Sequence, residues 1–139
     1  RIGYAISNPE LIKALNDVKY SYNSYTMNRP SLVLGVESIH DDAYFREKVG
    51  QIIATRERFV KEIAELGFTC LPSSANFVFA THESIPAKEI FAAAKENNIY
   101  VRYFDKPRID NYLRISIGTD AEMDAFVAFL KGYVETKQN

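Results

Sequence analysis

The sequence of 139 residues has a single cysteine, two histidines, no tryptophan and no apolar run that approaches a membrane span. One cysteine excludes an internal disulfide and favours a reducing compartment, so we expect a cytoplasmic protein. Cys70, beside Phe68 and Leu71, is expected to pack as a small hydrophobic residue. His40 and His82 lack metal-ligand spacing, and we expect both at the surface. The scattered glycines form no phosphate-binding loop.

No charge of one sign dominates the chain. The 17 basic and 18 acidic residues give a net charge of −1 and are interspersed, which predicts binding to neither nucleic acid nor a membrane surface. Hydrophobic residues make up 47% and charged residues 25%, close to the averages of globular domains. The chain is therefore expected to fold, and it is long enough to bury a sizeable core.

The first part of the chain predicts one strand followed by helices. Residues 1–6 are typical of a strand, and Asn8 followed by Pro9 is typical of a helix start. Residues 31–40 predict a second helix. Between the helices, residues 19–30 are rich in tyrosine and asparagine. This segment fits a binding-site lining or interface and equally fits a surface loop with packed aromatic residues.

A long helix is expected from Asp41 or Asp42 to a stop at Gly67. Its basic residues alternate with acids, which predicts a solvated face with weak ion pairs. They are Arg46, Lys48, Arg56, Arg58 and Lys61.

After Gly67 the pattern changes to alternating strands and helices. Strands are expected at residues 68–71, 76–81 and 99–104 and from Leu113, with a helix opening at residues 84–86 and a last helix capped by Thr119 and Glu122. A strand, helix and strand over residues 76–104 predict a right-handed parallel crossover. The fold class expected is α/β (α+β), with a small mixed sheet covered by helices on one face.

Two arginines lie in short apolar strands where an aliphatic or neutral residue is usual. Arg102 and Arg114 flank a polar turn, residues 105–110, so the strands are expected to form an antiparallel hairpin. Pairing Phe104 with Tyr112 would place the two arginines opposite each other. Like charges in that position favour a shared anion, and a guanidinium suits a carboxylate or phosphate.

Two other interpretations of these arginines remain open on spacing alone. Strand arginines commonly face solvent or pair with a nearby acid. A shift of the register by one residue would also put Arg102 and Arg114 on opposite faces of the sheet.

Three motifs resemble fold-type I, pyridoxal-phosphate-dependent aminotransferases, in the order and at about the spacing found there. Residues 112–119 (YLRISIGT) are similar to the carboxy-terminal arginine motif of that family. Residues 1–6 (RIGYAI) are similar to the end of its lysine motif, and residues 73–79 (SSANFVF) to its Ser-x-Ala-Asn-Phe strand. The likeness covers essentially the whole chain and favours the histidinol-phosphate aminotransferase branch.

The resemblance implies a carboxy-terminal portion of such an enzyme. The Schiff-base lysine would precede Arg1, so no catalytic residue is expected in this chain and it should be inactive alone. Residues 1–45 would be the last strand and helices of the large cofactor-binding domain with an interdomain segment. Residues 46–139 would be the small carboxy-terminal domain. The intact enzyme would be a homodimer in histidine biosynthesis.

The family's residue roles carry over to three arginines. Arg1 matches the ligand of the phosphate of pyridoxal 5'-phosphate. Arg114 matches the arginine that binds the substrate anion: an amino-alcohol phosphate in one half-reaction, glutamate or 2-oxoglutarate in the other. Arg102 matches a second substrate-binding arginine.

Two other functions remain open. A pyridoxal-phosphate enzyme such as threonine-phosphate decarboxylase would use a similar pair of arginines. A free-standing regulatory module that binds a small anion would need the same hairpin without any catalytic lysine.

Overall fold

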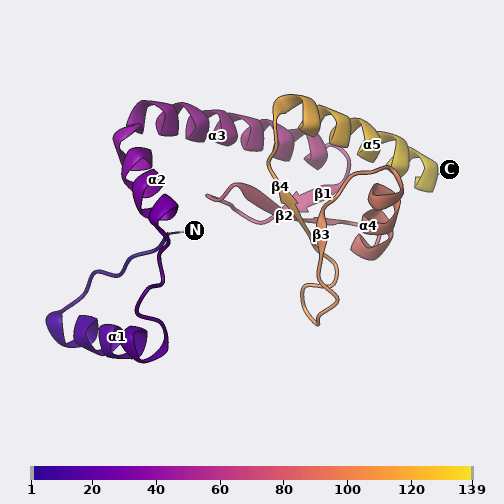
Figure 1. Ribbon diagram of the computed structural model, residues 1–139. Helices are drawn as coiled ribbons and strands as arrows, with labels where there is room; N and C mark the ends of the chain where they lie inside the picture. Colours follow the sequence, from indigo (N-terminus) through magenta and orange to yellow (C-terminus); the bar gives the residue numbers. More distant parts are fainter. Residues whose placement is uncertain (1, 139) are drawn as a thin grey trace. The chain divides into compact units, whose positions relative to one another are not determined.

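The computed structural model describes residues 2–138, with five helices and four strands (Figure 1). The elements are α1 Pro9–Tyr22, α2 Arg29–His40, α3 Asp42–Ala64, β1 Phe68–Cys70, β2 Phe77–His82, α4 Ala87–Glu96, β3 Arg102–Tyr103, β4 Leu113–Ser116 and α5 Asp120–Gln138. They form two compact units that divide between Arg46 and Glu47, within α3. No helix in residues 2–138 is both long and apolar enough to cross a membrane.

The amino-terminal unit contains α1, α2 and the start of α3. Asparagine side chains cap the first two helices: Asn8 Oδ1 accepts from Leu11 N at 2.9 Å, and Asn28 Oδ1 accepts from Ser31 N at 2.8 Å. The strand expected at residues 1–6 is wrong for its described part, which is irregular from residue 2 onward. A strand is stabilised by hydrogen bonds to a neighbouring strand, and the described part of this unit contains no strand with which residues 2–6 could pair.

The four strands of the second unit form one sheet in the order β1-β2-β4-β3, and every neighbouring pair is antiparallel. The expected mixed sheet is therefore wrong, whereas the expected pairing of the Leu113 strand with β3 as a hairpin is confirmed. β2 and β3 do run in the same direction, but β4 lies between them. Leu113 and Ile115 of β4 are each 1% exposed, which suits the centre of a sheet better than an edge.

Helices cover one face of this sheet and leave the other open. Val78 and Ala80 of β2 and Leu113 and Ile115 of β4 are buried against α3, α4 and α5. Figure 1 shows α5 beside the carboxy-terminal half of α3, where Phe59 and Phe126 stack with ring centroids 6.0 Å apart. The alternate residues of β2 and β4 are more exposed and line the open face: Phe77, Phe79, Thr81, Arg114 and Ser116.

His82 is a buried structural residue, so the expectation of a surface histidine is wrong. Its Nδ1 accepts from the backbone N–H groups of Ser84 and Ile85 at 3.1 and 3.0 Å. The proton therefore resides on Nε2, which donates to the Leu66 carbonyl at 2.9 Å. Gly67, with φ of 84°, reverses the chain beside this ring, and a Cβ there would come within 3.0 Å of Nε2.

Candidate anion-binding site

Arg102 and Arg114 lie directly opposite each other on β3 and β4. The next pair in the register is Tyr103 with Leu113, which agrees with the pairing of Phe104 with Tyr112 considered from the sequence. Because Leu113 and Ile115 point into the core, Arg114 between them points to the open face. Directly opposite residues of an antiparallel pair share a face, so the alternative with the two side chains on opposite faces is excluded, and both arginines are exposed.

Neither guanidinium group makes a hydrogen bond or ion pair with any residue that the structure describes. Other cations in the same part of the chain do have acidic partners: Arg58 pairs with three carboxylates, and Lys137 with Glu89 at 2.7 Å. The interpretation of Arg102 and Arg114 as partners of a nearby acid is therefore wrong, whereas the interpretation of both as solvent-facing residues agrees with their exposure. Their N–H donors face solvent and are available to a ligand.

Aromatic rings surround the two guanidinium groups instead of acids. The Arg102 Cζ lies 5.2 Å from the centroid of the Phe104 ring. The Arg114 Cζ lies 5.7 Å from the same centroid and 5.6 Å from that of Phe77. A ring face attracts a cation without occupying its in-plane N–H donors. The arrangement therefore holds both cations and leaves their hydrogen-bonding edges free.

The turn between β3 and β4 is fixed to the rest of the sheet. Asn111 Nδ2 donates to Thr81 Oγ1 at 2.9 Å, and Asn111 Oδ1 accepts from Ala87 N at 3.4 Å. Arg108 in the turn has φ of 75°, in the left-handed region that few side chains adopt. One asparagine thus joins the turn to the end of β2 and the start of α4, which holds the hairpin in its register.

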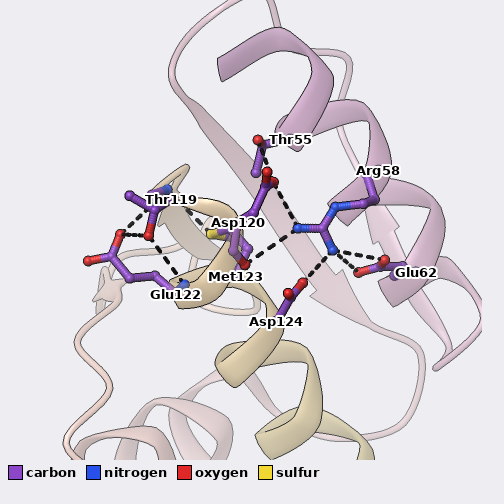
Figure 2. Close-up of polar contacts among 9 residues, drawn as sticks. Thr55, Arg58, Glu62, Thr119, Asp120, Glu122, Met123 and Asp124 are labelled. Carbon is purple, nitrogen blue, oxygen red and sulfur yellow. Dashed lines mark hydrogen bonds and ion pairs between the residues drawn. The ribbon is translucent and has the colours of Figure 1, made fainter. Parts of the chain in front are cut away.

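A second polar cluster fixes the start of α5, just after β4 (Figure 2). The guanidinium of Arg58 contacts Glu62 and Asp120, each at 3.0 Å, and also Asp124. Hydrogen bonds to these carboxylates raise the pKa of Arg58. Thr55 Oγ1 donates to Asp120 at 2.8 Å, and this bond, followed by that from Arg58, lowers the pKa of Asp120. Ion pairs therefore join α3 to the start of α5, just after the end of β4.

The predicted capping box at the start of α5 is confirmed. Thr119 N and Oγ1 donate to the Glu122 carboxylate at 2.7 and 2.9 Å, and Glu122 N donates back to Thr119 Oγ1 at 3.4 Å. The backbone and side-chain bonds from Thr119 lower the pKa of Glu122. The Thr119 and Glu122 N–H groups at this helix end are therefore bonded within the protein.

Sequence reasoning missed the roles of two arginines on α3. Arg56 Nη1 donates to the Ala75 carbonyl at 2.7 Å, and Arg58 reaches α5. The expectation of a solvated face with weak pairs is wrong for both. The spacing of Arg58 and Glu62 signals their own pair, but nothing local in the sequence signals a partner as distant as Asp120.

Two other sequence predictions concern single residues. Arg1, the predicted ligand of the cofactor phosphate, lies outside the described residues. Cys70 is half-buried, and burial raises the pKa of its thiol to about 11. The thiol is therefore protonated at neutral pH, as a packed side chain rather than a nucleophile would be.

Residues 1–130 match the sequence pattern of the family Aminotransferase class I and II. The chain belongs to this family. A histidinol-phosphate aminotransferase of Brachyspira hyodysenteriae is 47% identical over 131 residues, which are 94% of this chain and 37% of that protein. The chain thus spans little more than a third of the length of this relative.

Solved structures of other proteins share the fold. The histidinol-phosphate aminotransferase of Sinorhizobium meliloti in complex with pyridoxal-5'-phosphate matches with a TM-score of 0.79 and 24% identity, over 94% of this chain and 36% of that one. A decarboxylase from Sulfurospirillum multivorans matches with a TM-score of 0.75 and 25% identity, over 93% and 38%. Likeness of fold therefore does not separate the two reaction types.

Proposed function

We propose that this chain is the carboxy-terminal portion of a histidinol-phosphate aminotransferase and supplies the substrate's anion-binding site. Residues 1–45 would end the large domain, and residues 46–139 would form the small domain. The observation that carries the proposal is the pair Arg102 and Arg114, opposite in register, exposed and free of acidic partners among the described residues. The 47% identity to a named histidinol-phosphate aminotransferase favours this substrate over others.

Arg114 receives the anionic group of each substrate in turn. In one half-reaction this is the phosphate of histidinol phosphate, and in the other a carboxylate of glutamate or 2-oxoglutarate. A guanidinium can donate two parallel hydrogen bonds to either group. Arg102, opposite, adds a second cation, which suits a phosphate dianion better than a single charge would.

Pyridoxal 5'-phosphate, when bound, supplies the electron sink of transamination. The start of α5 does not suit its phosphate, because the Glu122 carboxylate already accepts from the Thr119 N–H there and the Glu122 N–H donates to Thr119 Oγ1. We therefore expect the cofactor phosphate to be held by Arg1 and by residues outside this chain. A lysine preceding Arg1 would carry the cofactor.

This chain's own contribution is to bind and orient the substrate. Holding the far end of the substrate by its anion fixes the direction of the reacting carbon relative to the cofactor. Movement of the small domain toward the large one would then exclude water. We further propose that the complete enzyme is a cytoplasmic homodimer, as the family resemblance implies.

The test is an assay of the complete polypeptide that contains this chain. The proposal predicts a lysine encoded shortly before Arg1 and transfer of the amino group from histidinol phosphate to 2-oxoglutarate. Release of carbon dioxide from a phosphorylated amino acid, without need for 2-oxoglutarate, would indicate the decarboxylase instead. A coding sequence that begins at or near Arg1 would overturn the enzyme proposal and favour a regulatory anion-binding module.

A further inference from the structure

Phe104 differs from the other aromatic residues of the open face in contacting both arginines. The Arg102 Cζ lies 5.2 Å and the Arg114 Cζ 5.7 Å from its ring centroid. Phe77 approaches Arg114 alone, at 5.6 Å. Phe79 stacks on Tyr112 instead, with centroids 4.6 Å apart and an angle of 10° between the rings. One ring is thus common to the two cations.

From this geometry we infer that Phe104 is a positioning residue that holds both guanidinium groups ready for a single anion; the inference rests on the proposed function. Two cations on facing strands repel each other, and long arginine side chains can move apart in solvent. A ring that attracts both opposes this separation. The ligand then meets two donors that are already in place, and less freedom is lost on binding.

The backbone fixes where this ring lies. Phe104 follows β3 directly, two residues after Arg102, and its ring lies on the face of the sheet that carries both arginines. Its carbonyl accepts from Lys106 N at 2.9 Å, within the turn that Asn111 anchors. The ring is half-buried, whereas the Arg102 and Arg114 side chains beside it are exposed. Of the three side chains, Phe104 is therefore the least mobile.

The chain offers a matched control for loss of a ring near this strand. Phe91 of α4 is also half-buried and packs against Tyr103, the neighbour of Phe104, with centroids 5.8 Å apart. No cation–ring contact with Phe91 occurs among the described residues. A Phe91→Leu change therefore removes an aromatic side chain beside β3 without touching either guanidinium group.

The test compares Phe104→Leu, Phe104→Met, Phe104→Tyr and Phe91→Leu in the complete polypeptide. We expect Phe104→Leu and Phe104→Met to raise KM for histidinol phosphate about fivefold, the size of one exposed cation–ring contact. The inhibition constant of inorganic phosphate should rise by the same factor. kcat should stay within about twofold, because the ring does not touch the reacting atoms. Phe104→Tyr, which keeps the ring, and Phe91→Leu should both match the unaltered protein.

The outcomes separate the inference from the proposed function. An unchanged KM in Phe104→Leu and Phe104→Met, in an enzyme that uses histidinol phosphate, overturns the positioning role and leaves the proposed function standing. An equal rise in KM in Phe104→Tyr also overturns it, since it shows a packing effect rather than an effect of the ring. Failure of the unaltered protein to use histidinol phosphate or bind phosphate overturns both.

Discussion

Arg102 and Arg114 face each other on adjacent antiparallel strands, and no described acid lies within ion-pair distance of either. Like charges in this position lower the stability of a sheet. Two aliphatic residues would pair more favourably there. The arrangement is reasonable if the two cations serve a ligand, because functional sites commonly sacrifice local stability.

Anions should stabilise the folded chain through this pair of arginines. Phosphate at ten times its Kd is expected to raise the free energy of unfolding by about 1.4 kcal/mol. Thermal unfolding at constant ionic strength, with chloride as the reference salt, measures the effect. Arg114→Ala should abolish the difference between the salts, whereas Lys131→Ala on α5, an equal loss of charge, should preserve it. A phosphate effect that survives Arg114→Ala would place the anion elsewhere.

Acid should weaken the junction of α3 and α5 through Asp120. The folded pKa of Asp120 lies below its ordinary value, because Thr55 and Arg58 donate to the ionised form. Its contribution is therefore fully present above about pH 5 and is lost as pH falls through about 4 toward the lower folded pKa. Asp120→Asn should melt at a lower temperature than the unaltered chain at pH 7, and the difference between them should shrink as pH falls below about 4.

The control for this acid effect is Glu57→Gln. Glu57 is exposed on the same helix as Arg58 and forms no ion pair with any described residue. Its substitution should leave the pH profile of the melting temperature unchanged. Equal profiles for Asp120→Asn and the unaltered chain would show that the junction contributes nothing.

Cys70 should react slowly with thiol reagents in the folded chain. Burial raises the pKa of its thiol to about 11, so at pH 8 the thiolate is a very small fraction. Because the chain has one cysteine, colour development with a disulfide reagent reports this residue alone. We expect the rate to rise at least about tenfold when urea unfolds the chain. Equal rates in both states would contradict the assigned burial.

Phe59 should be among the residues most important for stability. It is completely buried and stacks on Phe126, where α3 meets α5 over the sheet. Phe59→Ala is expected to cost about 3–5 kcal/mol, because it leaves a cavity as well as removing apolar contacts. Tyr100→Ala, at a position 77% exposed, should change stability by less than about 0.5 kcal/mol. Chemical denaturation measures both.

Local signals in the sequence correctly predicted much of the site. The polar turn predicted the hairpin of β3 and β4, because a turn acts over a few residues, and the pairing of Phe104 with Tyr112, one of the registers left open, agrees with the observed pair of Arg102 and Arg114. The cap at Thr119 and Glu122 follows from direct bonds between near neighbours. The stop after α3 follows from Gly67, which takes a positive φ readily.

What the sequence did not predict depends on contacts between distant segments. β4 lies between β2 and β3 because of how its buried face packs. The sequence of a single strand carries little information about its place in the order of the sheet. His82 is buried because Leu66, Ser84 and Ile85 satisfy both ring nitrogens. The partners of Arg58 on α5 are equally remote in sequence.

The central claim is that Arg114, with Arg102, holds the substrate's anionic group. The most direct test is the steady-state kinetics of the complete polypeptide with histidinol phosphate, comparing Arg114→Ala and Arg102→Ala with Lys131→Ala. We predict that Arg114→Ala lowers kcat/KM by about 30- to 100-fold, the worth of a charge-assisted hydrogen-bonded pair, while cofactor binding measured by absorbance is unchanged. Arg102→Ala should show a smaller fall and Lys131→Ala none. Values of kcat/KM for Arg114→Ala that equal those of Lys131→Ala would contradict the account.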